Sequence, residues 1–341
     1  MNIIIVNTVP IEFDETFLNK AGLGGSETWA IQLANSFVKK NHQVTVISHC
    51  KSHTASNGVV YISNSELDDI VTSCHFDLCI ISRCYANYIE VIDEFHMADN
   101  VFVQAHDVSV YGNDFNGITT LPCFKGVSTL SAYQERVIHE QTGLNWKYLF
   151  RIGNGIDPTL FENINCEPKN KNLLFSSAYW RGADIIEHSI LPKLGGICMD
   201  VCSYEKIENV DSNGVNVLGS LNKEKLYYEM GQRYCWFYPS VFTETFCITM
   251  IENVMCDNDL ILPMDYGMSS VLEPYVNDIS MKYRFNKDDN EYWMAVDESI
   301  YRINESINNR DKNKELRREL KNYVLNKYTW DIIANKWLQL I

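Results

Sequence analysis

The chain has 341 residues, of which 46% are hydrophobic and 21% are charged. A typical domain has roughly 150 residues, so this length favours two domains, and the composition excludes an intrinsically disordered chain. Lysine and arginine number 29 against 44 aspartate and glutamate, for a net charge of −15. This balance argues against broad binding to nucleic acid or to an anionic membrane, while leaving room for a local basic pocket that holds one small anion.

The cysteines and the apolar runs indicate the compartment. Eleven cysteines, an odd number, show no even and closely spaced framework, which indicates reduced thiols in a cytoplasm-like compartment. Cys198 and Cys202 are near neighbours, but no second Cys or His pair completes a structural zinc site. No uninterrupted apolar run reaches the roughly 18–20 residues that span a bilayer. We therefore expect a cytoplasmic, acidic protein of two domains.

The first half of the chain alternates apolar runs with helical patterns. The run 2–7 is apolar without alternation and predicts a buried parallel strand. A helix is expected over 28–40, where Trp29, Leu33 and Phe37 recur at helical spacing. Further strands are expected at 43–48, 77–81, 100–104 and 126–128. Strands that alternate with helices predict a parallel α/β sheet covered on both faces.

The second half repeats this organisation. The polar segment 162–172 is the best candidate for a linker. After it, strands are expected at 173–177, 196–200, 215–218, 235–238 and 259–262. The region 312–327 is helical in composition, and an apolar stripe from Trp330 to Leu340 needs a partner surface. Two α/β units of similar size suggest two lobes that face a cleft.

The strongest functional pattern is a pair of carboxylates, Glu244 and Glu252, at a loop-to-helix transition after a predicted strand. Ligands of open α/β sheets bind at the carboxyl ends of the strands, so both carboxylates would face one crevice. The N–H groups of Phe246, Cys247 and Ile248, at the start of that helix, would hold an anion or hydroxyl oxygens. A helix start can lower the pKa of a thiol, but no histidine stands beside Cys247, and packing is its favoured role. The structural alternative is that Glu244 stabilises the helix dipole and Glu252 is a solvated helix residue.

A pair of glycines, Gly24 and Gly25, opens the first predicted helix. Paired glycines let the backbone approach a ligand closely at the positive end of a helix. The alternative is a plain loop in which Ser26 caps the helix and Glu27 occupies its first turn. A dinucleotide-binding fingerprint is disfavoured, because Glu27 stands at its third glycine position and the glycines lie well downstream of the first strand.

Two further polar residues follow predicted strands. Arg181 stands in the loop between the strand 173–177 and a helix expected over 183–191, where its permanent charge would pair with a diphosphate. His106 ends the strand 100–104 and would form a hydrogen bond with a sugar hydroxyl. The alternatives are a surface arginine and a structural histidine. No Asp-x-Asp pattern emerges, so we expect no obligatory divalent ion.

Together these residues resemble glycosyltransferase family 4. The motifs occur in the family's order and span nearly the whole chain: Gly24-Gly25-Ser26-Glu27, His106-Asp107, Gly153-Asn154-Gly155-Ile156-Asp157, Arg181-Gly182, and Glu244 with Glu252. The segment that holds the two glutamates is specific, the glycine pair moderately so, and the others are weak singly. The resemblance implies the GT-B fold, with two Rossmann-like, doubly wound lobes facing an interdomain cleft and a C-terminal helix that crosses back to the first lobe. The implied domains are 1–158 on the acceptor side, 159–325 for the nucleotide sugar and 326–341 for the crossing helix.

The resemblance also implies an activity. It is a retaining transfer of a sugar from a UDP-, GDP- or ADP-linked donor to a carbohydrate or lipid-linked acceptor, without a metal or other cofactor. The implied catalytic residues are Glu244, Arg181 and His106, and the implied donor-binding residues are Gly24, Gly25, Asn154, Phe246, Cys247, Ile248 and Glu252. In these roles the glutamates hold hydroxyls of the sugar and the ribose, and the arginine neutralises the diphosphate.

Two positions depart from the family's pattern. Ser176 and Ser177 stand where a second diphosphate cation is usual, and Cys247 occupies a place that glycine often takes. Both departures bear on the identity of the donor more than on the reaction class. A nucleotide-sugar epimerase of the same fold and a non-catalytic nucleotide-sugar-binding protein stay open as alternatives. Peripheral membrane contact also stays open, because lipid-linked acceptors are common in the family, and the sequence leaves the oligomeric state unspecified.

Overall fold

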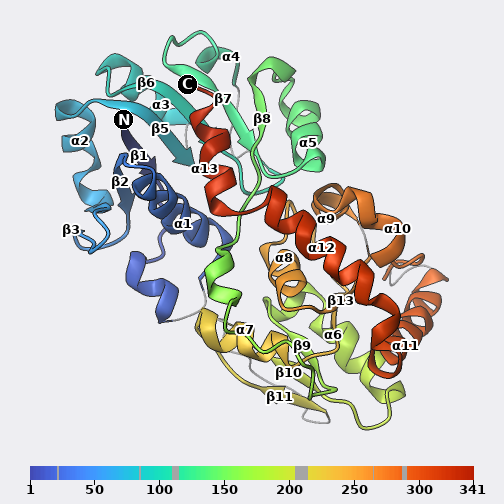
Figure 1. Ribbon diagram of the computed structural model, residues 1–341. Helices are drawn as coiled ribbons and strands as arrows, with labels where there is room; N and C mark the ends of the chain where they lie inside the picture. The colour runs from blue at the N-terminus through green and yellow to red at the C-terminus, as the bar shows by residue number, and fades with distance from the viewer. Residues whose placement is uncertain (21–22, 84–85, 110–114, 204–213, 264, 286–289) are drawn as a thin grey trace. The chain divides into compact units, whose positions relative to one another are not determined.

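The computed structural model describes residues 1–20, 23–83, 86–109, 115–203, 214–263, 265–285 and 290–341. The chain divides into two compact units (Figure 1). The first unit comprises 1–17, 24–155 and 328–341, and the second comprises 18–23 and 156–327. The polar segment 162–172 therefore lies inside the second unit and does not separate the two.

The first unit is built on one sheet of eight strands in the order β3-β4-β2-β1-β5-β6-β7-β8. The strands are β1 Asn2–Val6, β2 Gln43–Ser48, β3 His53–Thr54, β4 Val60–Ser63, β5 Phe76–Ser82, β6 Ala98–Gln104, β7 Phe124–Thr129 and β8 Leu149–Arg151. All neighbouring pairs are parallel except β3 with β4. The five strands expected in this half are confirmed. The sequence missed β3, β4 and β8, which are too short to show a hydrophobic period.

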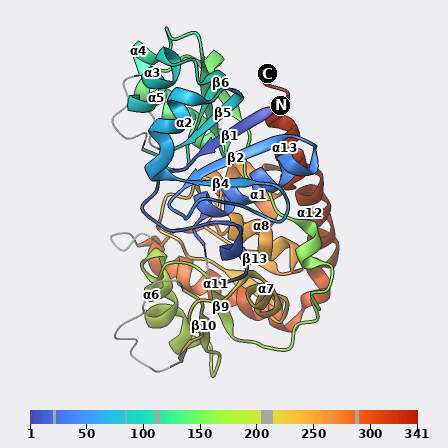
Figure 2. The same cartoon turned by 90° about the vertical axis from the view of Figure 1, so that its left-hand side faces the viewer.

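Helices cover both faces of this sheet, as a doubly wound fold requires. They are α1 Gly25–Lys39, α2 Leu67–Ser73, α3 Ala86–Glu94, α4 Phe115–Ile118, α5 Ala132–Thr142 and α13 Trp330–Leu338. Apolar side chains of α2, α3, α4 and α5 join those of the strands in one buried cluster, while α1 and α13 pack together on the other face (Figure 2). The predicted stripe of α1 is confirmed, since Trp29, Leu33 and Phe37 are all fully buried.

The C-terminal helix α13 packs on the first unit. Its Trp337 is fully buried and meets Phe102 of β6 edge to face, with ring centroids 5.6 Å apart. Asp331 accepts a hydrogen bond from Ser36 of α1 at 3.3 Å, and Lys336 donates one to the backbone oxygen of Ile152 at 3.0 Å. The apolar stripe that begins at Trp330 thus finds its partner surface in the first unit.

The second unit has two small parallel sheets. One has the order β11-β10-β9, with β9 Leu173–Phe175, β10 Met199–Val201 and β11 Val215–Val217, and the other pairs β12 Cys235–Phe237 with β13 Asp259–Ile261. The five strands expected here are present, but the one expected at 196–200 begins only at Met199. The helices are α6 Ala183–Ile185, α7 Lys223–Gly231, α8 Ile248–Met255, α9 Tyr266–Val271, α10 Val276–Ile279, α11 Glu291–Asn308 and α12 Lys314–Lys327.

The helix expected over 183–191 changes its winding along its length. Its first turn is α6, residues Ile186–Ile190 form a π-helix, and Leu191–Lys193 form a 3-10 turn. Pro192 explains the change, because proline offers no N–H to the preceding turn and its ring clashes with the carbonyl four residues earlier.

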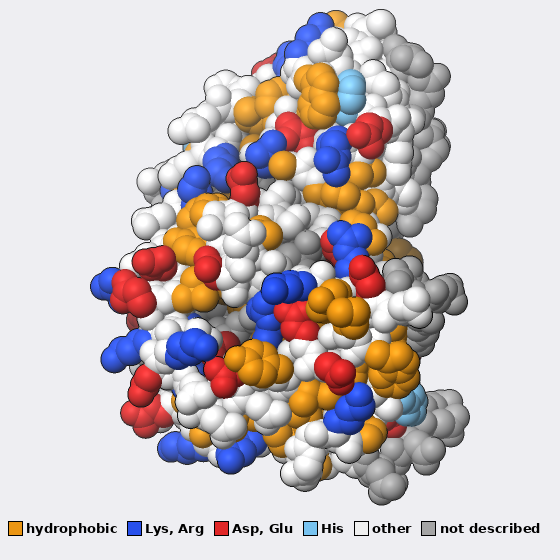
Figure 3. All heavy atoms as spheres, turned by 90° about the vertical axis from the view of Figure 1, so that its right-hand side faces the viewer, with side chains coloured by type: hydrophobic (Ala, Val, Ile, Leu, Met, Phe, Trp, Pro, Cys, Tyr) orange, Lys and Arg blue, Asp and Glu red, His pale blue; other side chains and the backbone are white. Residues whose placement is uncertain are grey.

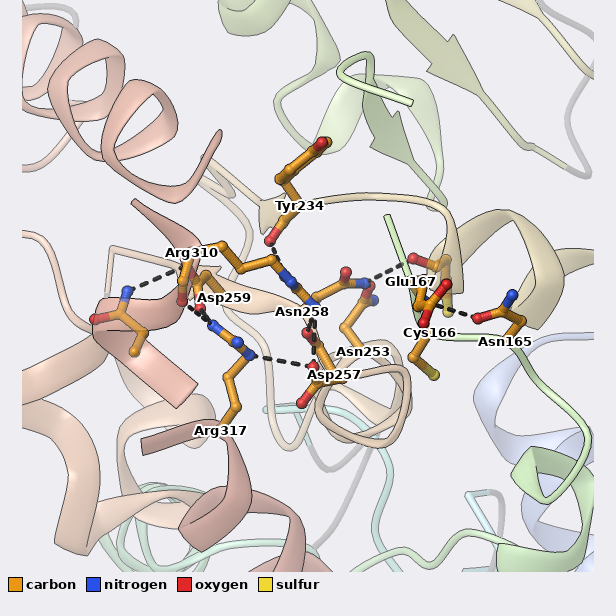
Figure 4. A network of polar contacts seen from close by, with 12 residues as sticks. Asn165, Cys166, Glu167, Tyr234, Asn253, Asp257, Asn258, Asp259, Arg310 and Arg317 are labelled. Atoms are coloured by element: carbon orange, nitrogen blue, oxygen red, sulfur yellow. Dashed lines mark hydrogen bonds and ion pairs between the residues drawn. The ribbon is translucent and has the colours of Figure 1, made fainter. Parts of the chain in front are cut away.

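Buried ion pairs fix α12 to the start of β13. The Arg317 guanidinium lies 2.8 Å from Asp259 and 3.3 Å from Asp257, and Arg310 lies 2.9 Å from the same Asp257 carboxylate (Figure 4). Arg310 also donates to the backbone oxygen of Tyr234 at 2.9 Å. Arg317 and Asp259 line a pocket at this amino end of the strand, the end opposite to that at which open α/β sheets bind their ligands.

On the face seen in Figure 3, basic and acidic side chains are interspersed and form no extended basic patch. Every cysteine that the structure describes is free. None of the described helices is both long enough and apolar enough to cross a bilayer.

Candidate functional site

A buried carboxylate lies in the loop that connects β12 to α8. Glu244 is 8% exposed, and its Oε1 accepts hydrogen bonds from the Tyr238 hydroxyl at 2.8 Å and from Arg181 Nη1 at 3.0 Å. Tyr238 directly follows β12, and Arg181 comes from the loop after β9. The carboxyl ends of two strands therefore bring these three side chains together, as the sequence predicted for Arg181 and Glu244.

Aromatic rings hold the Arg181 side chain in place. Its guanidinium carbon lies 4.1 Å from the ring centroid of Phe242 and 5.2 Å from that of Trp180. A guanidinium over a ring face is attracted by the ring quadrupole and loses conformational freedom. The Arg181 side chain stays 26% exposed, so its charge remains accessible to an anion from solvent.

Gly182 lets the Arg181 loop approach the end of β12. Its φ is +122°, and a Cβ atom at this position would lie 2.7 Å from the backbone oxygen of Pro239. Only glycine adopts this conformation without strain, and the contact leaves no room for a methyl group.

We predict that Gly182→Ala lowers the free energy of unfolding by about 1–3 kcal/mol, because the added methyl both strains the backbone and overpacks the loop. Urea unfolding of the variant measures this loss. Gly58→Ala is the matched control for φ alone, since Gly58 has φ of +95° but no atom within 4 Å of an added Cβ. An equal loss in both variants would contradict the overpacking.

Burial makes the ionised form of Glu244 costly. Burial raises the pKa of Glu244 above its ordinary value, and the neighbouring Arg181 charge and the hydrogen bond from Tyr238 act in the opposite direction. A buried carboxylate with its own charge partner is typical of a functional site. This environment disagrees with the structural alternative, in which Glu244 only stabilises a helix dipole.

The second carboxylate, Glu252, lies on α8 and is only 2% exposed. Its Oε1 accepts hydrogen bonds from Lys223 Nζ at 2.5 Å and from the Tyr227 hydroxyl at 2.8 Å, both from α7. Burial and the Glu252 charge raise the pKa of Tyr227 well above its ordinary value, so the phenol stays a donor. The alternative of a solvated Glu252 is therefore wrong. Both bonds end on the same oxygen, Oε1.

The start of α8 has an uncommon backbone. Cys247 precedes the helix with φ of +69°, the left-handed region that favours glycine. Cysteine thus holds a backbone conformation here that glycine adopts without strain. Burial and the Glu244 charge raise the pKa of the Cys247 thiol well above its ordinary value, which excludes a helix-activated thiolate. The helix itself begins at Ile248, one residue after Cys247 and two after the buried Phe246.

The glycine pair lies in the first unit at the start of α1. Gly24 is the N-cap, and its carbonyl accepts the first helical hydrogen bond from Thr28 at 3.1 Å. Ser26 does not cap the helix, because its hydroxyl donates to Glu27 Oε1 at 2.8 Å. A Cβ atom at Gly24 would lie 2.2 Å from Glu27 Oε2. A side chain at position 24 would therefore displace the folded-back Glu27 carboxylate.

Two more predicted site residues lie in the first unit. His106 follows β6, is 8% exposed and meets Trp29 edge to face at 5.0 Å between ring centroids. Burial and the nearby Arg83 charge lower its pKa well below the ordinary value, so the imidazole is neutral. Asn154 is 4% exposed, and its side-chain oxygen is buried with no hydrogen-bond partner within the described part of the chain.

The sequence did not single out three residues of the site. Lys223, Tyr227 and Tyr238 each donate a hydrogen bond to one of the two predicted carboxylates. Their segments contain no functional motif that would single them out in the sequence. The spacing of Lys223 and Tyr227, one turn apart, is the signal by which the pair on α7 could have been found.

Comparisons with known proteins give the fold. No protein-family model matches this chain, and no curated protein matches it. Among solved structures, it is similar to a glycosyltransferase from Rickettsia africae, with TM-score 0.74, 14% identity, and coverage of 99% of this chain and 97% of the other. It is also similar to Anabaena HepE in complex with UDP and glucose, with TM-score 0.69, 13% identity, and coverage of 99% and 98%. WaaG, a glycosyltransferase involved in lipopolysaccharide biosynthesis, matches with TM-score 0.70, 11% identity, and coverage of 98% of each chain. The expected GT-B fold class is confirmed over nearly the whole chain.

Proposed function

We propose that this protein is a glycosyltransferase that moves a sugar from a nucleotide-diphosphate sugar to an acceptor hydroxyl, as a member of the family that its motifs resemble. The observation that carries the proposal is the pair of buried, hydrogen-bonded carboxylates, Glu244 and Glu252, on either side of the start of α8, with Arg181 against the first. The fold is that of glycosyltransferases, and HepE has been solved with UDP-glucose, which favours a nucleotide-sugar donor.

Both hydrogen-bond acceptors and hydrogen-bond donors of the protein would hold the nucleotide sugar. Glu244 would accept hydrogen bonds from hydroxyls of the donor sugar, together with the amides of Phe246, Cys247 and Ile248, which would donate to the donor's oxygens. Glu252 would accept from the ribose hydroxyls. Carboxylates suit both tasks, because ionised oxygens accept strong hydrogen bonds from hydroxyl groups.

Arg181 would supply the charge that the reaction needs. As the bond between the anomeric carbon and the diphosphate oxygen breaks, negative charge builds on the leaving diphosphate, and a fixed guanidinium stabilises it. No metal is required for this task, and the proposed reaction is metal-independent. Gly24, Gly25 and Asn154 of the first unit would contribute to donor binding, and the neutral His106 would form a hydrogen bond with the transferred sugar.

The proposed stereochemical course is retention by front-face attack. The acceptor oxygen would form its bond on the face from which the diphosphate leaves, and its proton would pass to the leaving oxygen. Glu244 would then bind sugar without attacking the anomeric carbon. Mass spectrometry of protein incubated with donor alone should find no glycosyl ester on Glu244, and a trapped ester would overturn the front-face course.

Donor binding is the first test of the proposal. UDP, GDP and ADP are each titrated in a thermal-shift assay, and the matching nucleotide at 100 times its Kd should add about 2.7 kcal/mol of stability. A screen of donor hydrolysis across UDP-, GDP- and ADP-sugars then identifies the sugar. Absence of binding by all three nucleotides would favour a non-catalytic protein of this fold. Conversion of the donor sugar without an acceptor would favour an epimerase.

We predict that Glu252→Gln weakens binding of that nucleotide by tenfold or more, because the amide is a poorer acceptor for ribose hydroxyls than the carboxylate. Isothermal titration calorimetry measures the change. Glu224→Gln in the first turn of α7 is the control, since Glu224 is exposed and its substitution should leave the affinity unchanged. Equal affinities for Glu252→Gln and the wild type would remove Glu252 from the site.

A further inference from the structure

A histidine and two carboxylates converge in the first unit, apart from the residues assigned to the donor. One ligand atom from each of Asp14, Glu15 and His53 lies within 4.8 Å of the other two. His53 Nε2 is 3.0 Å from Glu15 Oε2. Asp14 and Glu15 come from the segment between β1 and α1, and His53 comes from β3.

The backbone fixes where these side chains lie. Phe13 is fully buried, its N–H donates to the His49 oxygen at 3.1 Å, and its oxygen accepts from Ser48 at 2.9 Å. This anchors the chain just before Asp14 to the end of β2. The Asp14 Oδ1 atom accepts from the backbone and the hydroxyl of Thr16, at 2.9 and 2.5 Å, which orients the carboxylate and leaves its other oxygen available.

The imidazole of His53 is oriented as in a metal ligand. Its Nδ1 lies 2.8 Å from the backbone oxygen of Lys51, so Nδ1 carries the proton that this bond requires. Its Nε2 lies 3.0 and 3.3 Å from the two oxygens of Glu15, so the metal-free ring donates its second proton to that carboxylate, and an ion would take the place of this proton. Histidines that bind metals almost always donate their other N–H to a backbone oxygen or a carboxylate in this way.

A buried phenol provides the second observation. Tyr61 of β4 is the cross-strand partner of His53, and the two rings stack at 5.3 Å between centroids. Tyr61 is fully buried, and within the described ranges its hydroxyl has no hydrogen-bond partner. Burial, and to a smaller extent the charges of Glu15 and Asp14, raise the pKa of Tyr61 above its ordinary value, so the phenol keeps its proton. A buried hydroxyl without a partner is costly, and a water molecule bound to an ion at the cluster would give it one.

We propose that Asp14, Glu15 and His53 bind a zinc ion that joins the segment after β1 to the β3–β4 hairpin. Imidazole and carboxylate ligands favour zinc over magnesium or calcium, which take oxygen ligands. Zinc bonds of about 2.0–2.2 Å in a tetrahedral site put neighbouring ligand atoms roughly 3.4 Å apart. The distances from His53 Nε2 to the two Glu15 oxygens, 3.3 and 3.0 Å, are close to this value. Water fills the fourth position. The ion holds a loop in place and takes no part in the proposed sugar transfer.

The test is zinc binding by the full chain after removal of metals by dialysis against a chelator. A chromophoric zinc indicator competes with the protein, and the number of ions bound per chain is compared between the wild type and His53→Gln. We expect the wild type to bind one more ion than the variant. Zinc held by thiols is common to both proteins and cancels in the difference. Equal numbers would overturn the proposal.

His75→Gln is the matched control. The His75 Nδ1 atom also lies 2.8 Å from a backbone oxygen, that of His96, but its Nε2 faces a single exposed carboxylate, Asp99, at 3.4 Å. This variant should bind as much zinc as the wild type, and an equal loss in both would overturn the proposal. Glu15→Gln decides the matter if His53→Gln fails to fold, with a tenfold or greater weakening expected. Nucleotide binding is measured separately, so failure of the zinc site and failure of the proposed function are distinguishable.

Discussion

Replacing Arg181 with glutamine is expected to lower kcat/KM for sugar transfer by about 100-fold or more. The amide keeps a hydrogen-bond donor near Glu244 but removes the charge that would stabilise the departing diphosphate, and loss of one such donor typically costs this much. Steady-state kinetics with the donor found in the hydrolysis screen measures the effect. A loss confined to KM would indicate that Arg181 binds the ground state and transition state equally.

The same substitution has a second readout at Glu244. The Arg181 charge holds the pKa of Glu244 down against burial, so its removal raises that pKa further. A raised pKa means that a larger fraction of Glu244 is protonated at a given pH. The acid limb of the activity profile should therefore move to higher pH in Arg181→Gln. Arg318→Gln, at an exposed arginine paired with Glu315, is the control and should change neither quantity.

Replacing Arg317 with methionine is expected to lower the free energy of unfolding by about 3–5 kcal/mol. Arg317 is 5% exposed, and its loss leaves the Asp259 carboxylate buried without its main partner, which is the costly way to break a buried ion pair. Unfolding in guanidinium chloride, followed by circular dichroism, measures the change. Because the pair anchors α12 to β13, the transition of the second unit should move most.

Two further variants separate the ion pair from the packing around it. Arg318→Met alters the next residue of the same helix, where the side chain is 69% exposed, and should change stability by less than about 0.5 kcal/mol. Combining Arg317→Met with Asp259→Asn removes the uncompensated charge and should recover part of the loss. A double variant no more stable than Arg317→Met would show that the lost contacts of Arg317, and not the stranded charge, dominate.

The sequence predicted the strands of both units well because buried parallel strands are continuous apolar runs. It missed β3, β4 and β8, since strands of two to four residues are too short to show a period. The helix after β9 was predicted with a regular winding. Pro192, which explains its π turn, is visible in the sequence and could have corrected this prediction. The prediction of a linker at 162–172 is wrong, because a polar composition indicates that a segment is exposed but not that it separates two domains. The backbone N–H groups of Lys169 and Asn170 donate hydrogen bonds to the Gln232 oxygen within the second unit.

The site was predictable where residues lie close in sequence, and less so where distant elements meet. Glu244 and Glu252 flank one helix start, so their neighbourhood follows from local structure. The partners Tyr238, Lys223 and Tyr227 come from other segments, and their contacts depend on packing that no local pattern encodes. The same reason hid the cluster around His53, whose partner Glu15 stands 38 positions away.

The two outer strands of the eight-stranded sheet have a consequence for solubility. Long unpaired edges recruit strands from other molecules, and proteins shorten or reverse them to prevent this. Here one edge strand is the two-residue β3, which is antiparallel to β4. The other is the three-residue β8, where Arg151 forms an ion pair with Glu135 at 2.6 Å. Little backbone is left to template an intermolecular sheet, so the concentrated protein should resist fibril growth. Detachment of β3 would expose the hydrogen-bonding edge of β4 and weaken that protection.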